Sequence, residues 1–150
     1  MKKKELLFDD LDLKDRYSLA SSLPSSYVLG CEIGVWEGGY TSVLVSSTSM
    51  HIVAIDPWQA TDSYSEIYGS HSMEDVEKNP LLRGNDGFVW QEARYMGTLD
   101  NLKRFPLGKW TVLRGYSYKL KHFFPNESVD FVYIDGEHSY EAVSKDIADW

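Results

Sequence analysis

Residues 28–42 read VLGCEIGVWEGGYTS, and this stretch decides the fold that the rest of the chain predicts. It begins as a short apolar run, reaches an acid at Glu32, and passes through Gly34, Gly38 and Gly39 into a segment able to be helical. Glycine tolerates a positive φ and has no Cβ, so a turn built from it can approach a ligand closely. A strand, a glycine turn and a helix start in this order predict a site for a nucleotide-like ligand.

A second apolar run, His51–Ile55, is followed by Asp56, which lies 22 residues after Gly34. An acid at about this distance is well placed to accept hydrogen bonds from ribose hydroxyls. The spacing GxxxGxxxG at Gly30, Gly34 and Gly38 differs from the dinucleotide fingerprint GxGxxG, which the stretch lacks. A pyrophosphate is therefore disfavoured as the ligand, and so is a nicotinamide-dependent oxidoreductase.

Composition limits the class of protein. The chain has 150 residues, 43% of them apolar, which is the size of one domain with its own core. A net charge of −8 argues against nucleic acid as a partner, because nucleic-acid binding relies on clustered Lys and Arg. The one cysteine, Cys31, lies in an apolar run and predicts a core thiol in a reducing compartment. No apolar run has the length of a membrane span or signal peptide, so we expect a cytoplasmic protein.

The apolar pattern predicts helices alternating with strands. The predicted strands are Tyr27–Ile33, His51–Ile55, Trp110–Leu113 and Val129–Ile134, and the predicted helices are 9–23, Gly39–Ser47, a short one over Ser72–Lys78, Asp86–Arg104 and a last one from about Ser139. The strands lack polar alternation, as expected of parallel strands covered on both faces. Residues 57–84 show no sustained periodicity, and long irregular connections of this kind are often functional, so we expect them to form a lid over the site.

This alternation indicates an α/β fold, a Rossmann-like three-layer sandwich that forms a single domain over residues 1–150. Right-handed crossovers give a mostly parallel sheet with strand order 3-2-1-4. Ligands of such sheets bind outside the carboxyl ends of the strands, where the strand order reverses. Three acids that end predicted strands, Glu32, Asp56 and Asp135, are therefore expected to converge on one crevice.

Four segments resemble successive motifs of class I S-adenosylmethionine-dependent methyltransferases. They are residues 32–39 (EIGVWEGG), 54–58 (AIDPW), 114–117 (RGYS) and 129–140 (VDFVYIDGEHSY). The last segment is similar to that of a branch of small O-methyltransferase-like proteins with IDGxHSY after the fourth strand. The resemblance runs from about residue 27 to the end of the chain.

The resemblance implies how the cofactor, S-adenosylmethionine, would be held. Glu32 and the turn containing Gly34, Trp36 and Gly38 would hold its amino-acid end, since a carboxylate prefers a nearby ammonium. Asp56 would take both ribose hydroxyls.

The adenine end has its own implied residues. Pro57 and Trp58 would lie against the base, and Tyr116 and Ser117 would flank it or hydrogen-bond to it.

The resemblance also implies the catalytic side of the site. Asp135 would lie near the sulfonium and the substrate, and in metal-dependent relatives this position can ligate a divalent cation such as Mg²⁺. Methyl transfer from a sulfonium is an in-line displacement, so positioning a small-molecule acceptor supplies much of the acceleration. A hydroxyl acceptor benefits from a general base, and His138 is the candidate because the ordinary pKa of histidine lies near neutrality.

Each assignment has a structural alternative. Glu32 could cap the next helix or pair with a lysine, and Trp58 could be a core aromatic. Asp135 with Gly136 is a common turn dipeptide, and His138 could face solvent at a helix start. Four further charged residues are interpreted as solvated helix faces: Glu92, Arg94, Asp146 and Asp149.

Class I methyltransferases normally continue with further strands, whereas this chain ends at Trp150 in a helix whose predicted apolar face carries Tyr140, Val143 and Ile147. We therefore expect a C-terminally truncated domain in which strand 129–134 is an unpaired edge, covered by a second copy of the chain. The acceptor pocket normally uses C-terminal loops. A catalytically silent module that only binds the cofactor therefore stays open as an alternative to an active enzyme.

Overall fold

The computed structural model describes residues 13–59 and 87–150, and for residues 13 and 87–90 it describes only the backbone. Within these residues the centre is a four-stranded parallel sheet in the order β3-β2-β1-β4. Its strands are β1 (Leu29–Ile33), β2 (His51–Asp56), β3 (Trp110–Arg114) and β4 (Phe131–Ile134). The predicted Rossmann-like α/β fold and its strand order are confirmed.

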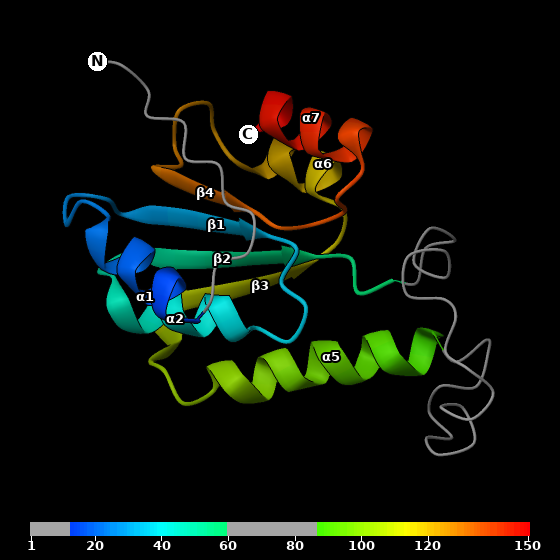
Figure 1. Ribbon diagram of the computed structural model, residues 1–150, viewed down its shortest axis with the longest axis horizontal. Coiled ribbons are helices and arrows are strands. Elements are labelled where there is room, and N and C mark those ends of the chain that lie inside the picture. Colours follow the sequence, from blue (N-terminus) through cyan, green and yellow to red (C-terminus); the bar gives the residue numbers. More distant parts are fainter. Residues whose placement is uncertain (1–12, 60–86) are drawn as a thin grey trace.

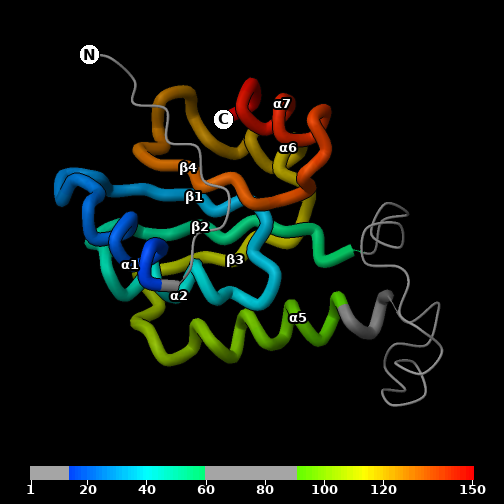
Figure 2. The backbone as a smooth tube through the Cα atoms, in the orientation of Figure 1, coloured from blue at the N-terminus to red at the C-terminus, as the bar shows by residue number. Residues whose placement is uncertain are grey.

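Helices cover both faces of the sheet, as Figure 1 shows. The helices α1 (Leu13–Ser22), α2 (Gly39–Ser47) and α5 (Gly87–Leu102) lie on one face, and α6 (Ser117–Leu120) and α7 (Tyr140–Asp149) lie on the other. Two short 3₁₀ helices lie in the connections: η2 (Leu107–Lys109) directly precedes β3, and η3 (Lys121–Phe123) directly follows α6. The backbone trace in Figure 2 shows the same three layers.

The strands bury both of their faces, as their apolar sequences predict. Ile52 of β2 packs with Leu44 of α2 on one face, while Cys31 of β1 and Val53 of β2 pack on the side of α6 and α7. Cys31 is a free, fully buried thiol, and burial raises its pKa to about 12. The core position predicted for this cysteine is confirmed.

The helix α2 depends on burial for its stability. Its Ser and Val residues are mediocre helix formers, and its N-cap residue, Gly38, makes no side-chain capping bond. Residues 40–45 are all buried, however, and a fully buried Leu44 alone contributes about 2–3 kcal/mol. Tertiary packing therefore fixes the helix that follows the glycine turn.

Two predicted strand starts are wrong, and Asp130 explains why. The strand β1 begins at Leu29 instead of Tyr27, and β4 begins at Phe131 instead of Val129. The Asp130 carboxylate accepts hydrogen bonds from the backbone N–H groups of Val28 and Leu29, at 2.8 and 3.0 Å. At this end of the sheet, the Asp130 side chain therefore bonds the backbone N–H groups that a neighbouring strand would otherwise bond.

The predicted apolar face of the last helix is also wrong. In α7, Tyr140 is 82% exposed and Ile147 is 66% exposed. Asp146 is buried instead, because its carboxylate accepts a hydrogen bond from the Ser117 hydroxyl of α6 and so sets which side of α7 faces inward. Trp150 still packs in the core, with its ring 5.1 Å from that of Phe124.

Several predicted segments fall wholly or partly outside the described residues. The helix predicted over 9–23 is confirmed for residues 13–22, and the helix predicted over 86–104 for Gly87–Leu102. Only residues 57–59 of the lid predicted over 57–84 are described, and the short helix predicted over Ser72–Lys78 lies outside the described residues. In the described sheet β4 pairs with β1 alone, and its cover by a second copy stays a prediction. None of the described helices is long and apolar enough to cross a membrane.

Candidate functional site

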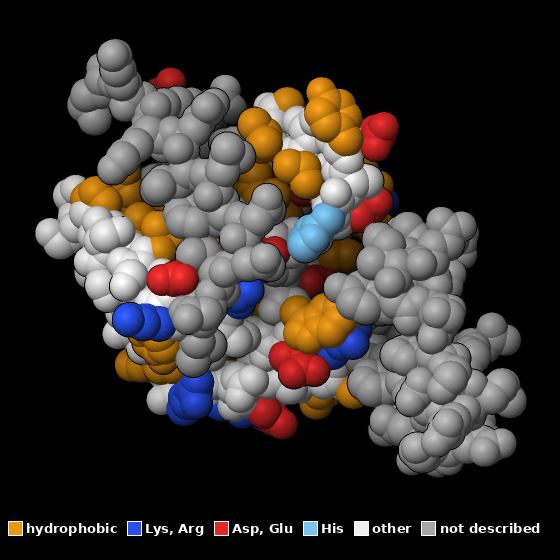
Figure 3. Space-filling model, in the orientation of Figure 1, with side chains coloured by type: hydrophobic (Ala, Val, Ile, Leu, Met, Phe, Trp, Pro, Cys, Tyr) orange, Lys and Arg blue, Asp and Glu red, His pale blue; other side chains and the backbone are white. Residues whose placement is uncertain are grey.

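A cavity of about 700 Å³ lies at the carboxyl ends of β1, β2 and β4. Glu32, Asp56 and Asp135 all line it, so the predicted convergence of the three strand-end acids is confirmed. This volume is in the range of ordinary small-molecule sites. Figure 3 shows acidic side chains and a histidine around the hollow at the centre of the described surface.

Asp56 fixes the glycine turn to the end of β2. One carboxylate oxygen accepts the N–H groups of Val35 and Trp36, at 2.8 and 3.1 Å, and the other accepts the N–H of Trp58 at 2.6 Å. A carboxylate has about four acceptor directions, so one is left over after these three bonds, and Asp56 lines the cavity. The first role of Asp56 is therefore to shape the turn, and its bond to a ribose stays a prediction.

The turn holds Trp36 in a conformation that a bulky residue rarely adopts. Its φ is +58°, in the left-handed region. The N–H of Trp36 donates to Asp56. The Trp36 carbonyl accepts hydrogen bonds from the Trp58 indole N–H (2.8 Å) and the Thr98 hydroxyl (3.2 Å). Its ring lines the cavity, with the Arg94 guanidinium 3.4 Å from the ring centre. Backbone strain of this kind persists only where neighbours over-determine it, and it clusters at ligand sites.

The glycines of the turn serve packing more than ligand approach. Gly34 has a φ of +85°, and a Cβ there would lie 2.2 Å from the backbone oxygen of Asp135. Gly38 has a φ of +74°, and a Cβ there would lie 3.0 Å from Thr98. Gly34 lines the cavity and Gly38 does not, and the cofactor contact predicted for Gly38 stays a prediction.

Trp58, which is predicted to contact the adenine, lies in the core of the described structure. This side chain is 1% exposed and packs against Val35, Ala54 and Tyr95 without reaching the cavity wall. Its buried N–H finds a partner in the Trp36 carbonyl, which is the usual requirement for a core tryptophan. This position matches the core-aromatic alternative, whereas Pro57 lines the cavity.

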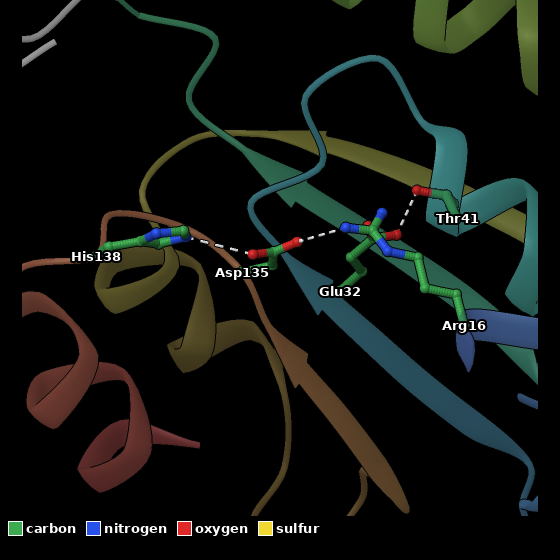
Figure 4. Close-up of polar contacts among 5 residues, drawn as sticks. All are labelled: Arg16, Glu32, Thr41, Asp135 and His138. Carbon is green, nitrogen blue, oxygen red and sulfur yellow. Dashed lines mark hydrogen bonds and ion pairs between the residues drawn. The ribbon is translucent and has the colours of Figure 1, made fainter. Parts of the chain in front are cut away.

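Glu32 is the deepest acid of the site. It is 2% exposed and accepts a hydrogen bond from the Thr41 hydroxyl of α2 (Figure 4). Burial raises the pKa of this carboxyl from 4.5 to about 8, and the Thr41 bond opposes the shift. Among the nearby charges, Asp135 and Asp56 raise the pKa and Arg16 lowers it. A cation bound in the cavity would favour the ionised form of Glu32.

Asp135 and His138 form the more open part of the site. One Asp135 oxygen lies 3.3 Å from His138 Nε2, and the other lies 3.7 Å from an Arg16 nitrogen (Figure 4). The Asp135 side chain is 34% exposed and that of His138 is 74% exposed. Among the described residues no three His, Cys, Asp or Glu side chains group closely enough to hold a metal ion. The metal role predicted for Asp135 therefore finds no ligand set in this part of the chain.

Tyr116 and Ser117 line the cavity on the side of α6. The Tyr116 hydroxyl donates to the Gln59 side chain at 3.2 Å, and the Ser117 hydroxyl donates to Asp146. Asp146 was interpreted as a solvated helix face, which is wrong, because it is buried and also lines the cavity.

Arg16 and Tyr40 are among the cavity residues that the sequence-based prediction of the site does not include. The Tyr40 hydroxyl is buried and has no hydrogen-bond partner among the described residues, and burial raises its pKa. Its position at the helix start directly after the glycine turn is a signal that could have found it. Arg16 lies outside every motif, and no sequence signal marks it.

The sequence that builds this site matches a known protein family. A family model described as a methyltransferase domain matches residues 31–150, which include most of the sheet and all three strand-end acids. The chain belongs to this methyltransferase family. The resemblance to class I S-adenosylmethionine-dependent methyltransferases is thereby confirmed at the level of the family. No curated protein gives a significant match to this chain.

Membership of the family implies S-adenosylmethionine as the cofactor, and the cavity of this chain fits such a group. The donor carries positive charge at its sulfonium and its ammonium, and the cavity wall supplies the acids Glu32, Asp56 and Asp135. The unpartnered Tyr40 hydroxyl offers a further hydrogen-bonding group in the same wall. Buried polar atoms without partners are costly unless a ligand or water completes them.

Proposed function

We propose that this protein transfers the methyl group of S-adenosylmethionine to a hydroxyl of a small molecule. One observation carries the proposal: three acids line a cavity of about 700 Å³ at the ends of parallel strands in a chain of the methyltransferase family. Sites at the carboxyl ends of such strands are where α/β sheets bind their ligands.

The geometry supports a division of the cofactor among the cavity residues. Glu32 and Tyr40 would hold the amino-acid end, since they combine a buried acid with an unpartnered hydroxyl. The free acceptor direction of Asp56 would take a ribose hydroxyl. Pro57 and Tyr116 line the wall beyond Asp56 and would contact the adenine.

Asp135 and His138 would serve the acceptor. When bound, the cofactor supplies an electrophilic methyl group. The contact of 3.3 Å between Asp135 and His138 Nε2 would orient the imidazole, and the exposed ring could pass a proton to water. His138 would take the proton of the acceptor hydroxyl, so that its oxygen can accept the methyl group.

The same observations favour a small acceptor. A net charge of −8 and an acid-lined cavity disfavour an extended phosphate backbone as the substrate. A free, fully buried cysteine is what a reducing compartment allows, so we place the protein in the cytoplasm.

Calorimetry with S-adenosylhomocysteine, the product of methyl donation, tests the cofactor. Mass spectrometry of a panel of hydroxyl, amine and thiol acceptors incubated with S-adenosylmethionine then tests turnover. Binding with a gain of one methyl group on a hydroxyl acceptor is the expected result. Binding without any product would favour the catalytically silent module, and tighter binding of NAD than of S-adenosylhomocysteine would overturn the proposal.

A further inference from the structure

Arg16 reaches the cavity from a helix that the family match does not include. The match covers residues 31–150, whereas Arg16 belongs to α1. Ala20 lies one helical turn further along α1 and is buried in the core beside Tyr40 and Leu44. Residues four apart share one face of a helix, so the burial of Ala20 directs Arg16 toward the cavity.

Among the described residues, Arg16 and Lys145 are the Lys and Arg side chains of the cavity wall. Lys145 already pairs with Asp149 at 3.4 Å, and it lies over the ring of Tyr118. Arg16 instead lies among the acids, close enough to Glu32 to lower its pKa. A ligand carboxylate that enters this acid-lined cavity therefore meets its most favourable partner at Arg16.

The guanidinium of Arg16 retains hydrogen-bonding capacity. Its contact with Asp135 measures 3.7 Å, which is an ion pair but longer than a hydrogen bond. The group carries five N–H donors in a planar fork that suits a carboxylate. The guanidinium carbon lies over the Tyr40 ring, 5.7 Å from its centre.

Arg16 and Glu32 together place a guanidinium beside a buried carboxyl on one wall of the cavity (Figure 4), and a bound cation would favour the ionised form of that carboxyl. An α-amino acid group carries the complementary pair, a carboxylate and an ammonium on neighbouring atoms. We propose that Arg16 binds the carboxylate of the methyl donor, so that α1 completes a cofactor site that the matched domain builds only in part. This inference rests on the proposed function.

The test compares two ligands on matched variants by calorimetry. The ligands are S-adenosylhomocysteine and its decarboxylated analogue, and the variants are Arg16→Ala, Arg16→Lys and the control Arg104→Ala. Arg104 also lies over an aromatic ring, 5.0 Å from the centre of Phe105, but it is exposed and is not part of the cavity wall. Arg104→Ala therefore removes a positive charge and a contact between a guanidinium and an aromatic ring, as Arg16→Ala does, but outside the cavity.

We expect Arg16→Ala to weaken S-adenosylhomocysteine binding about 10-fold or more, the scale of hydrogen bonds to charged groups. Its affinity for the decarboxylated analogue should change less than about 2-fold, because the interacting partner is missing. Arg16→Lys should fall between wild type and Arg16→Ala, since a lysine keeps the charge without the fork. Arg104→Ala should bind both ligands as the wild type does.

Three results would overturn the inference while leaving the proposed function in place. They are unchanged S-adenosylhomocysteine affinity in Arg16→Ala, equal weakening of both ligands, and an effect confined to the KM of the acceptor. Equal weakening would mean that Arg16 acts through packing, and an effect on the acceptor alone would assign Arg16 to the other substrate. Failure of the wild-type protein to bind S-adenosylhomocysteine would overturn the proposed function itself, and this inference with it.

Discussion

Asp56 and Asp135 line the same cavity, but their surroundings differ. Asp56 accepts three backbone N–H bonds of 2.6–3.1 Å, and the neighbouring Glu32 is almost completely buried. Asp135 is one-third exposed and has side-chain partners at 3.3 and 3.7 Å, of which His138 is mostly exposed. The region at the ends of β1 and β2 is therefore rigidly built, while the region after β4 can adjust. A fixed holding region and an adjustable reacting region suit a two-substrate transferase.

Gly34 joins the two regions, and its substitution should give the largest effect on folding. Gly34→Ala would add a Cβ at 2.2 Å from the Asp135 backbone oxygen, at a φ of +85° that L-residues rarely adopt. We expect a loss of about 3–5 kcal/mol in the free energy of unfolding, the sum of overpacking and backbone strain. Urea denaturation followed by circular dichroism measures it.

Gly97→Ala is the matched control, because Gly97 lies within α5 and a Cβ there meets nothing within 4 Å. This change should stabilise the protein by about 0.5–1 kcal/mol through helix propensity. A Gly34→Ala variant as stable as the wild type would show that the two regions are not in contact as described.

The pH dependence of stability should come next in size and should trace to Glu32. Its pKa is about 8 in the folded protein and 4.5 ordinarily, so between these values the unfolded chain releases a proton that the folded chain retains. Stability contributed by this group is therefore complete below pH 4.5 and falls as pH rises toward 8. We expect Glu32→Gln to remove this pH-dependent decline in the free energy of unfolding, which is on the order of 3 kcal/mol.

Thr41→Val sharpens this prediction. It deletes the hydrogen bond that opposes the shift, so the pKa of Glu32 should rise further and the decline should extend to higher pH. Thermal melts from pH 4 to pH 9 measure both variants. The same slope in wild type and Glu32→Gln would assign the pH dependence to other groups.

Asp56→Asn should cost about 2 kcal/mol of stability, because both carboxylate oxygens accept N–H bonds and an amide offers only one oxygen. Asp130→Asn is the control: there a single oxygen accepts both N–H bonds, so the amide oxygen can replace it. Chemical denaturation of the two variants should give a clear loss for Asp56→Asn and a smaller one for Asp130→Asn. Equal losses would contradict the claim that Asp56 shapes the turn.

Asp135→Asn and His138→Gln should have the smallest effect on folding, below about 1 kcal/mol, because both groups are partly or mostly exposed. Their effect should appear in turnover instead. With a hydroxyl acceptor we expect kcat to fall about 10²–10⁴-fold for His138→Gln, with S-adenosylhomocysteine affinity retained. A large loss of stability in either variant would contradict the claim that the region after β4 is less rigidly built than the region at the ends of β1 and β2.

The fold could be predicted because its signals are local. Apolar runs such as His51–Ile55 mark buried parallel strands, and an acid at the end of each run marks the edge at which ligands bind. Trp58 could not be placed, since its burial depends on a hydrogen bond to Trp36 that the turn creates. Arg16 and Asp146 could not be predicted as cavity residues. Which face of their helices points inward depends on contacts with residues distant in sequence.

The fully buried thiol in the middle of β1 gives the protein a built-in reporter. It is the one cysteine of the chain, so any alkylating reagent that modifies the protein reports on a single position. Because modification requires the thiolate to become accessible, the labelling rate of native protein should follow the opening of the central strand. Protection of Cys31 by a cavity ligand would then measure how far ligand binding stabilises the sheet, without any engineered probe.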